Sequence, residues 1–208
     1  MGNRAIITSK KRDLGVYVHW NGGRDSVEAF LKYCELRGFR SPERDTYGWA
    51  RLCQVLANYF GGDGLCVGID TYCESGASDF PIDNGVYVIA DWQIVGRVYP
   101  YDGFSEQTGY PLHDMLKAID KAQPADQQLG AYLDAEEVGA SEIEVGDRVY
   151  VRELDGTFKA YKVVGIGADR IMNGQCVKGV PFVDRFGYGS PAENINNYLR
   201  DKHIRRAK

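Results

Sequence analysis

Two segments in the first third of the chain repeat their apolar residues at the spacing of an α-helix, and this pattern constrains the fold more than any other feature. Asp25 and Glu28 match a capping pair at the start of the first segment, and Gly38 ends it. The second segment is predicted to begin near Ser41-Pro42-Glu43 and to end at Gly61-Gly62. The apolar positions are Val27, Phe30, Leu31 and Cys34 in the first segment, and Trp49, Leu52, Cys53, Leu56 and Phe60 in the second. A helix with one apolar stripe must bury it against another layer, so a layered fold is expected.

Segments rich in β-branched and aromatic residues surround these two helices and predict the strands of that layer. They are Ala5–Thr8, Gly15–Trp20, Leu65–Asp70, Gly85–Ala90 and Gln93–Tyr99. Short turns at residues 10–13 and at Asp91-Trp92 predict hairpins, and therefore an antiparallel sheet. A third helix is expected over Pro111–Lys121, packed on this sheet.

The pattern changes again after residue 122. Residues 123–142 are rich in Gln, Ala, Asp and Glu, and are interpreted as an acidic linker with a short helix near Leu129–Leu133. Strands are predicted at Arg148–Glu153 and Phe158–Val164, and a capping box at residues 190–193 predicts a final helix to about His203. We therefore expect an α+β fold. Residues 1–122 form a mixed domain with two helices packed on an antiparallel sheet, and residues 143–208 form a small SH3-like β-barrel that ends in a helix.

The charge is distributed unevenly along the chain. The 208 residues have a net charge of −4, and 44% of them are hydrophobic, which is enough for one large or two small packed domains. Residues 1–51 carry 10 basic and 6 acidic side chains, residues 52–147 carry 3 and 17, and residues 148–208 carry 12 and 6. An acidic section between two basic ones bears on partners rather than on the fold.

The features that the sequence lacks disfavour several classes of protein. No apolar run reaches the roughly 20 residues of a membrane span, and the N-terminus lacks the apolar core of a signal peptide, so a cytoplasmic protein is expected. The five cysteines are interpreted as reduced core residues. No His or Cys spacing suits zinc, so neither a metal nor another cofactor is expected. No P-loop, Gly-x-Ser-x-Gly or His-Glu-x-x-His motif occurs, which disfavours the familiar enzyme classes.

The segment from Tyr17 to Asp25 is the most suggestive local feature, because a strand leads into a glycine-rich turn at the start of a helix. Backbone N–H groups in such a turn, together with the guanidinium of Arg24, can bind a phosphate or a carboxylate. His19 is then a candidate acid–base group, and Trp20 is a candidate binding residue. The alternative is an ordinary strand-to-helix connection, in which Asp25 as the cap occupies N–H groups and repels anions.

Carboxylates in the predicted loops and strand ends form a second candidate set: Asp63, Asp70, Glu74, Asp79, Asp83 and Asp91. Converging carboxylates can hold a divalent ion for phosphodiester cleavage, whereas the structural alternative is a solvated acidic rim. Such a rim can also bind a basic groove by placing negative charge where nucleic-acid phosphates bind.

A third candidate set is the basic one on the predicted C-terminal strands, Arg148, Arg152, Lys159 and Lys162, which alternate with Tyr150, Phe158 and Tyr161. Basic and aromatic residues on one face are typical of a platform for RNA or single strands. The tail adds Arg200, Lys202, Arg205, Arg206 and Lys208. The structural alternative is a solvated strand face followed by a helix whose dipole these cations complement.

One stretch resembles a known group of proteins: Val18-His19-Trp20-Asn21-Gly22-Gly23-Arg24-Asp25-Ser26-Val27-Glu28, with Tyr47-Gly48-Trp49-Ala50-Arg51 and Val67-Gly68-Ile69-Asp70. It is similar to uncharacterised small proteins of plasmids, phages and integrative elements in Gram-positive bacteria, over roughly the first 100 residues. Those proteins often lie in neighbourhoods with antirestriction and anti-CRISPR genes. The resemblance implies a counter-defence role, such as inhibition of a type II CRISPR effector nuclease or of its guide RNA.

Three functions remain open. The first is a non-enzymatic inhibitor that binds a bacterial defence nuclease through Asp63, Asp79, Asp83 and Asp91, with the C-terminal domain contacting guide RNA. The second is a nuclease acting on guide RNA or DNA, with His19 as the acid–base group, Arg24 as the phosphate clamp and a divalent metal held by nearby carboxylates. The third is an accessory protein of a mobile element with neither activity.

Overall fold

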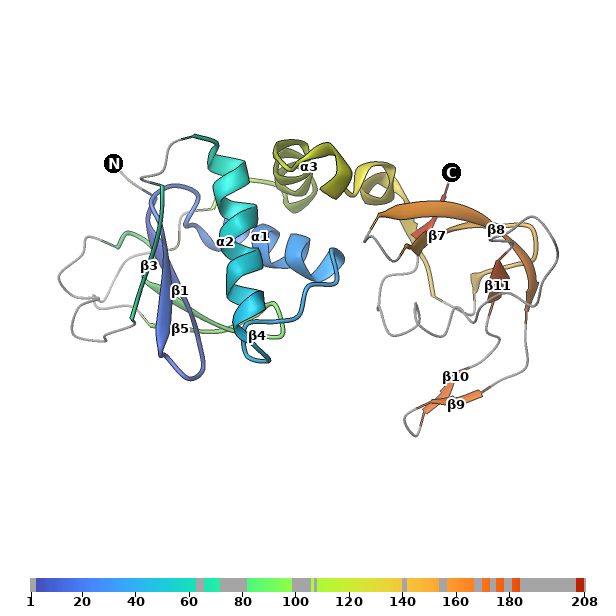
Figure 1. The fold of residues 1–208 in the computed structure, drawn as a ribbon, viewed down its shortest axis with the longest axis horizontal. Helices are drawn as coiled ribbons and strands as arrows, with labels where there is room; N and C mark the ends of the chain where they lie inside the picture. Colours follow the sequence, from blue (N-terminus) through green and yellow to red (C-terminus); the bar gives the residue numbers. More distant parts are fainter. Residues whose placement is uncertain are drawn as a thin grey trace. The chain divides into compact units, whose positions relative to one another are not determined.

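The chain divides into two compact units, Met1–Gln128 and Leu129–Lys208 (Figure 1). The computed structural model describes residues 3–62, 66–71, 82–98, 106, 108–139, 142–153, 157–166, 170–172, 175–177, 181–183 and 205–207. The predicted α+β class is confirmed for these residues. None of their helices combines the length and the apolar character that a bilayer span requires.

The sheet of the first unit has the strand order β3-β2-β1-β4-β5. Its strands are β1 (Ala5–Ser9), β2 (Leu14–Val18), β3 (Val67–Thr71), β4 (Val86–Ala90) and β5 (Gln93–Val98). The predicted antiparallel sheet is wrong in one respect, because β1 and β4 pair in parallel. The local turns predict each hairpin correctly, but they carry no information on how two hairpins separated by two helices join through their inner strands.

The helices α1 (Arg24–Leu36) and α2 (Thr46–Phe60) match the two predicted segments, but both begin differently. Gly23, and not Asp25, is the N-cap of α1. Asp45 caps α2 by accepting a hydrogen bond from the backbone N–H of Tyr47 at 3.0 Å, so the predicted start near Ser41 is wrong. The buried residues of both helices include most of the predicted apolar faces.

The third helix, α3 (Leu112–Ala122), lies within one residue of the predicted bounds at each end but has a different neighbour. It packs on α1 and α2, and not on the sheet as predicted. Polar groups in the contact are satisfied: the buried Tyr33 hydroxyl donates to Asp120 at 2.7 Å, and the Gln123 side-chain amide donates to the Val55 carbonyl at 3.3 Å. An apolar stripe shows that a helix is buried, but not which surface buries it.

The second unit contains a sheet with the strand order β11-β8-β7-β12-β6 and a separate β9–β10 hairpin. Its strands are β6 (Glu136–Glu137), β7 (Arg148–Arg152), β8 (Phe158–Ile166), β9 (Arg170–Met172), β10 (Gln175–Val177), β11 (Pro181–Val183) and β12 (Arg205–Arg206). The sheet does not close on itself within the described residues, so the SH3-like barrel is not confirmed. The predicted final helix at residues 190–203 lies outside the described residues.

Residues 129–138, predicted as part of a linker, contribute to the core of this second unit. The short helix predicted there is a 3-10 helix over Gly130–Asp134. Leu129, Tyr132 and Leu133 are buried, and the Tyr132 ring stacks on Phe158 with 4.0 Å between the ring centroids. The stretch is therefore a packed element, although its composition is typical of a linker.

Strand β12 brings the basic end of the chain against the acidic section. The Arg206 Nε atom lies 3.1 Å from Asp147, and Arg206 also pairs with Glu136 at 3.6 Å. The Arg205 guanidinium lies over the Tyr132 ring and donates to the Tyr132 carbonyl at 3.0 Å. Residues 129–208 carry 12 basic and 12 acidic side chains, so this unit has no net charge. The predicted basic tail is in part a structural strand.

Glycine at position 22 should be required by the fold of the first unit. A Cβ atom on Gly22 would lie 2.6 Å from the Ala5 backbone nitrogen, whereas nothing lies within 4 Å of one on Gly62. We expect Gly22→Ala to lower the free energy of unfolding by about 2–3 kcal/mol and Gly62→Ala to leave it nearly unchanged. Urea denaturation monitored by tryptophan fluorescence measures this, because all three tryptophans lie in residues 1–128. Equal stability of the two variants would refute the close approach.

Removal of the Arg206 side chain should loosen the second unit. Arg206→Ala leaves the Asp147 and Glu136 carboxylates without their cation, and we expect the β7 amides to exchange at least about tenfold faster with deuterium. Arg44→Ala, which removes a 70% exposed guanidinium from the first unit, serves as the control. Unchanged exchange in β7 would contradict a structural role for this strand.

Candidate functional site at the start of α1

The glycine-rich turn before α1 is explained by close packing of the backbone. The Gly22 N–H donates to the Asn3 carbonyl at 2.7 Å, and Asn21 has a positive φ of 54°. The absence of a side chain at Gly22 lets the turn lie directly against the first residues of β1. These contacts are those of a tight strand-to-helix connection, which is the alternative to an anion-binding turn.

His19 lies on the face of the sheet opposite α1. Its backbone N–H donates to the Cys66 carbonyl at 2.9 Å, so it continues the pairing of β2 with β3. Side chains two residues apart share one face, and accordingly the Tyr17 hydroxyl lies 2.8 Å from His19 Nδ1. Burial raises the pKa of the Tyr17 hydroxyl. This pair is the geometry that an acid–base role for His19 would use.

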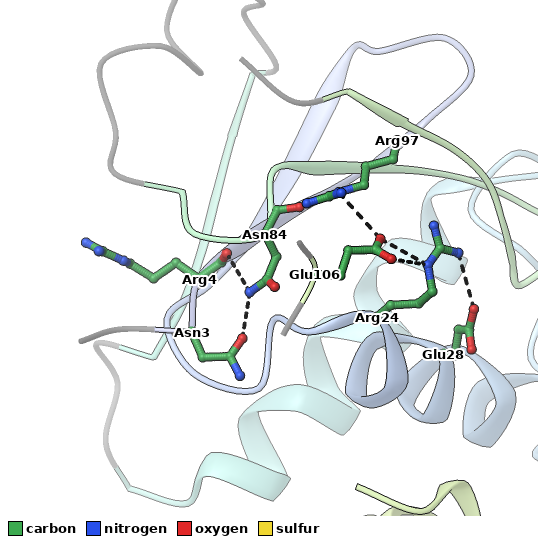
Figure 2. Close-up of polar contacts among 7 residues, drawn as sticks. All are labelled: Asn3, Arg4, Arg24, Glu28, Asn84, Arg97 and Glu106. Atoms are coloured by element: carbon green, nitrogen blue, oxygen red, sulfur yellow. Dashed lines mark hydrogen bonds and ion pairs between the residues drawn. The ribbon is translucent and has the colours of Figure 1, made fainter. Parts of the chain in front are cut away.

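Arg24 lies on the face of the sheet that α1 covers. The anion that it binds is the carboxylate of Glu106, a residue of the same chain (Figure 2). The Arg24 guanidinium lies over the ring of Tyr87, which is aligned with the buried Ile7. Its Nε atom donates to both carboxylate oxygens of Glu106, at 3.0 and 2.7 Å. Because His19 and Arg24 lie on opposite faces, the structure does not assemble the catalytic pair of the nuclease hypothesis.

Glu106 joins α1 to the sheet, and it was not among the residues predicted from the sequence. Besides Arg24, its carboxylate lies 3.4 Å from Arg97 Nε, which also donates to the Asn84 carbonyl at 2.8 Å. The hydrogen bond to Glu106 raises the pKa of Arg24, and burial followed by the charge of Glu106 raises the pKa of Tyr87. Glu106 is 82 residues from Arg24 in sequence, so no local spacing could have revealed the pair.

Asp83 is paired with Arg4 of the same chain. Its carboxylate accepts from the Arg4 backbone N–H at 3.0 Å and from Arg4 Nε at 2.8 Å. The neighbouring buried Asn84 donates to the Asn3 side chain at 2.6 Å (Figure 2). These contacts join the start of β1 to the start of β4, and the hydrogen bond from Arg4 lowers the pKa of Asp83.

The other candidate carboxylates do not join Asp83. Asp91 lies at the opposite end of β4, at the tip of the β4–β5 hairpin, where its side chain is 75% exposed and lies 3.9 Å from Arg44. Asp63 and Asp79 lie outside the described residues, as does Glu74, and the Asp70 side chain is not described. Within the described ranges, no three His, Cys, Asp or Glu side chains could hold a metal ion. Asp83 and Asp91 therefore belong to different surfaces.

Exposed apolar side chains flank the first turn of α1. Trp20 is 44% exposed, and its ring lies edge-on to His19 at 4.9 Å between centroids. Tyr110 and Leu112 are also exposed, and Asp25 fixes their segment by accepting from the N–H groups of Gly109 and Tyr110 at 2.6 and 2.7 Å. We call Trp20, Tyr110 and Leu112 the Trp20 surface. Of these three residues only Trp20 was predicted from the sequence, because exposure of the others depends on the tertiary fold.

The predicted basic platform of the second unit is divided between the two faces of its sheet. The pairing of Arg148 with Lys162 places these residues on one face, which Arg152 shares by alternation, whereas Lys159 pairs with Val151 and lies on the other. The aromatic rings on the first face contact Tyr132: Phe158 stacks on it, and Tyr150 meets it edge-on at 5.8 Å. These rings are therefore engaged within the unit.

Comparison of the chain with protein-family models, curated proteins and solved structures finds no match. The function is therefore inferred from the geometry described above.

The Arg4–Asp83 pair should make the stability of the first unit depend on acidity. A lowered pKa means that the contribution of the pair is complete above the ordinary carboxyl pKa of 3.8 and is lost as the pH falls through the lower pKa of the folded state. We expect Asp83→Asn to be less stable than wild type at pH 7 and the difference to disappear in acid. Urea denaturation between about pH 2.5 and 7 tests this. Asp91→Asn is the control, and a difference for Asp83→Asn that is constant with pH would contradict the assignment.

Proposed function

We propose that the chain is a counter-defence protein of a mobile element, an anti-CRISPR-type inhibitor that acts by binding a nucleic-acid-handling effector nuclease. The Trp20 surface is the observation that carries this proposal. Exposed tryptophan and tyrosine side chains beside a well-packed helix are typical of the residues that dominate protein–protein binding energy. The resemblance of the first 100 or so residues to proteins of mobile elements supports the class of target.

The positions of the charged groups also favour binding over turnover. Arg24 is paired with Glu28 and Glu106, and Asp83 is paired with Arg4. Redirecting Asp83 to a metal ion would leave the partly buried Arg4 guanidinium without this carboxylate, and redirecting Arg24 to a substrate phosphate would break its two hydrogen bonds to Glu106, both of which are costly. We place the bound nuclease in the bacterial cytoplasm and expect no cofactor.

Asp91 is the candidate acidic contact that remains accessible in the described part of the chain. It lies on a tight turn in which both Asp91 and Trp92 have positive φ, and Trp92 is buried. A carboxylate presented on such a rigid tip can steer association with a basic groove. It lies at the opposite end of the sheet from the Trp20 surface, so it acts as a second, separate contact.

The nuclease hypothesis remains the alternative, because the Tyr17–His19 pair is held in a suitable geometry. It makes a different prediction: His19→Ala should abolish inhibition with binding unchanged. The inhibitor hypothesis predicts that His19→Ala inhibits nearly as well as wild type.

The Trp20 surface can be tested by binding of the full chain to a guide-loaded effector nuclease. We expect Trp20→Ala to weaken binding at least about tenfold, because the side chain is a candidate hot spot. Asp91→Lys should slow association and reduce its dependence on salt. Val95→Ala, which truncates another exposed apolar residue on β5, is the matched control. Wild-type affinity of Trp20→Ala, with normal folding, would refute the proposed surface.

A further inference from the structure

The connection between α1 and α2 is held tightly against α2. A Cβ atom on Gly48 would lie 2.5 Å from the Pro42 nitrogen and 2.6 Å from the Arg40 carbonyl oxygen, so only glycine permits this approach. The indole N–H of Trp92 donates to the Phe39 carbonyl at 2.7 Å and fixes the other side of the connection. The side chains of this connection therefore have defined positions beside those of α2.

Arginine and aromatic side chains alternate on the surface that results. The guanidinium carbon of Arg40 lies 5.3 Å from the centre of the Tyr47 ring, and that of Arg51 lies 5.5 Å from the centre of the Phe39 ring. Tyr47 and Arg51 are four residues apart on α2, so they are neighbours on one helix face. Tyr47 is 65% exposed, the largest exposed fraction among the large hydrophobic side chains of the described residues.

The exposed arginines of this surface are only loosely neutralised. They are Arg40, Arg44 and Arg51, whereas Arg37 is buried. Arg40 pairs with Asp45 at 2.8 Å, and Arg44 lies 3.9 Å from Asp91, but both arginines are well exposed. Arg51 donates to the neutral Gln54 amide at 2.6 Å, and no carboxylate within the described ranges pairs with it. Exposed ion pairs are weak, so a phosphate can replace these carboxylates at little cost.

We propose that Phe39, Arg40, Arg44, Tyr47 and Arg51, which we call the Tyr47 surface, bind single-stranded nucleic acid. A base stacks on the open side of the Tyr47 ring, and the three exposed arginines contact the flanking phosphates. Duplex bases are stacked on each other and do not reach such a ring, so single strands are preferred. The surface belongs to the first unit, whereas the sequence predicted RNA contact for the C-terminal strands of the second unit, and it does not depend on the inhibitor function.

The test uses the full chain and fluorescently labelled oligonucleotides of about 12 nucleotides, oligo-U and oligo-dT, at about 50 mM salt. Fluorescence polarisation should detect binding to single strands and at least about tenfold weaker binding to a duplex of the same length. Tyr47→Ala should weaken single-strand binding about tenfold, and Tyr47→Trp should restore it, because stacking requires an aromatic ring. The high exposure of Tyr47 keeps these variants folded, which circular dichroism checks.

A charge-matched pair of variants separates this surface from general electrostatic attraction. Arg40, Arg44 and Arg51 are replaced together by Gln in one variant, and the exposed Lys10, Lys11 and Arg12 are replaced in the other. We expect the first variant to lose most of the binding and the second to lose less than about threefold. Equal losses, unchanged binding of Tyr47→Ala, or equal affinity for the duplex would each overturn the proposal.

Discussion

The parallel pairing of β1 with β4 is the constraint on which the rest of the first unit depends. It joins two hairpins that are separated in sequence by two helices, and it is reinforced where both strands begin by Arg4 with Asp83 and by Asn3 with Asn84. The turn before α1 closes on the same point, because Gly22 lies directly against the first residues of β1. The start of α1, and with it the Trp20 surface, is therefore fixed by contacts with the N-terminal strand.

Many charged side chains form ion pairs within the chain, and the net charge of −4 does not reveal them. In the second unit, the basic β12 lies between the acidic β6 and strand β7, and its arginines meet carboxylates from the section that looked like an acidic linker. In the first unit, Arg24 and Arg97 share the carboxylate of Glu106. The acidic and basic sections of the sequence are thus partly each other's partners. Of the charged residues that the proposals use, Asp91 and the arginines of the Tyr47 surface are exposed, whereas Arg24 and Asp83 are paired within the chain.

Patterns with a local physical origin were predicted well from the sequence. The α1 and α2 segments follow from apolar spacing, and the Asp91-Trp92 turn follows from hairpin geometry, which the positive φ of both residues confirms. The caps were predicted less well. Asp25 accepts from Gly109 and Tyr110 and Gly23 is the N-cap of α1, whereas α2 is capped by Asp45 and does not begin near Ser41. The pairing of β1 with β4 and the position of Glu106 beside Arg24 are non-local. No local spacing in the sequence encodes these contacts. The observed site therefore differs from the predicted one mainly in the partner of Arg24.

The central claim is that the protein acts by binding and not by turnover. The most direct measurement is the dependence of target cleavage by a guide-loaded effector nuclease on the amount of added protein, with the length of the guide RNA followed in the same reaction. Binding predicts that inhibition is complete only near equimolar protein and that the guide remains intact. Loss of cleavage at a small fraction of the nuclease concentration, with a shortened guide, would contradict it.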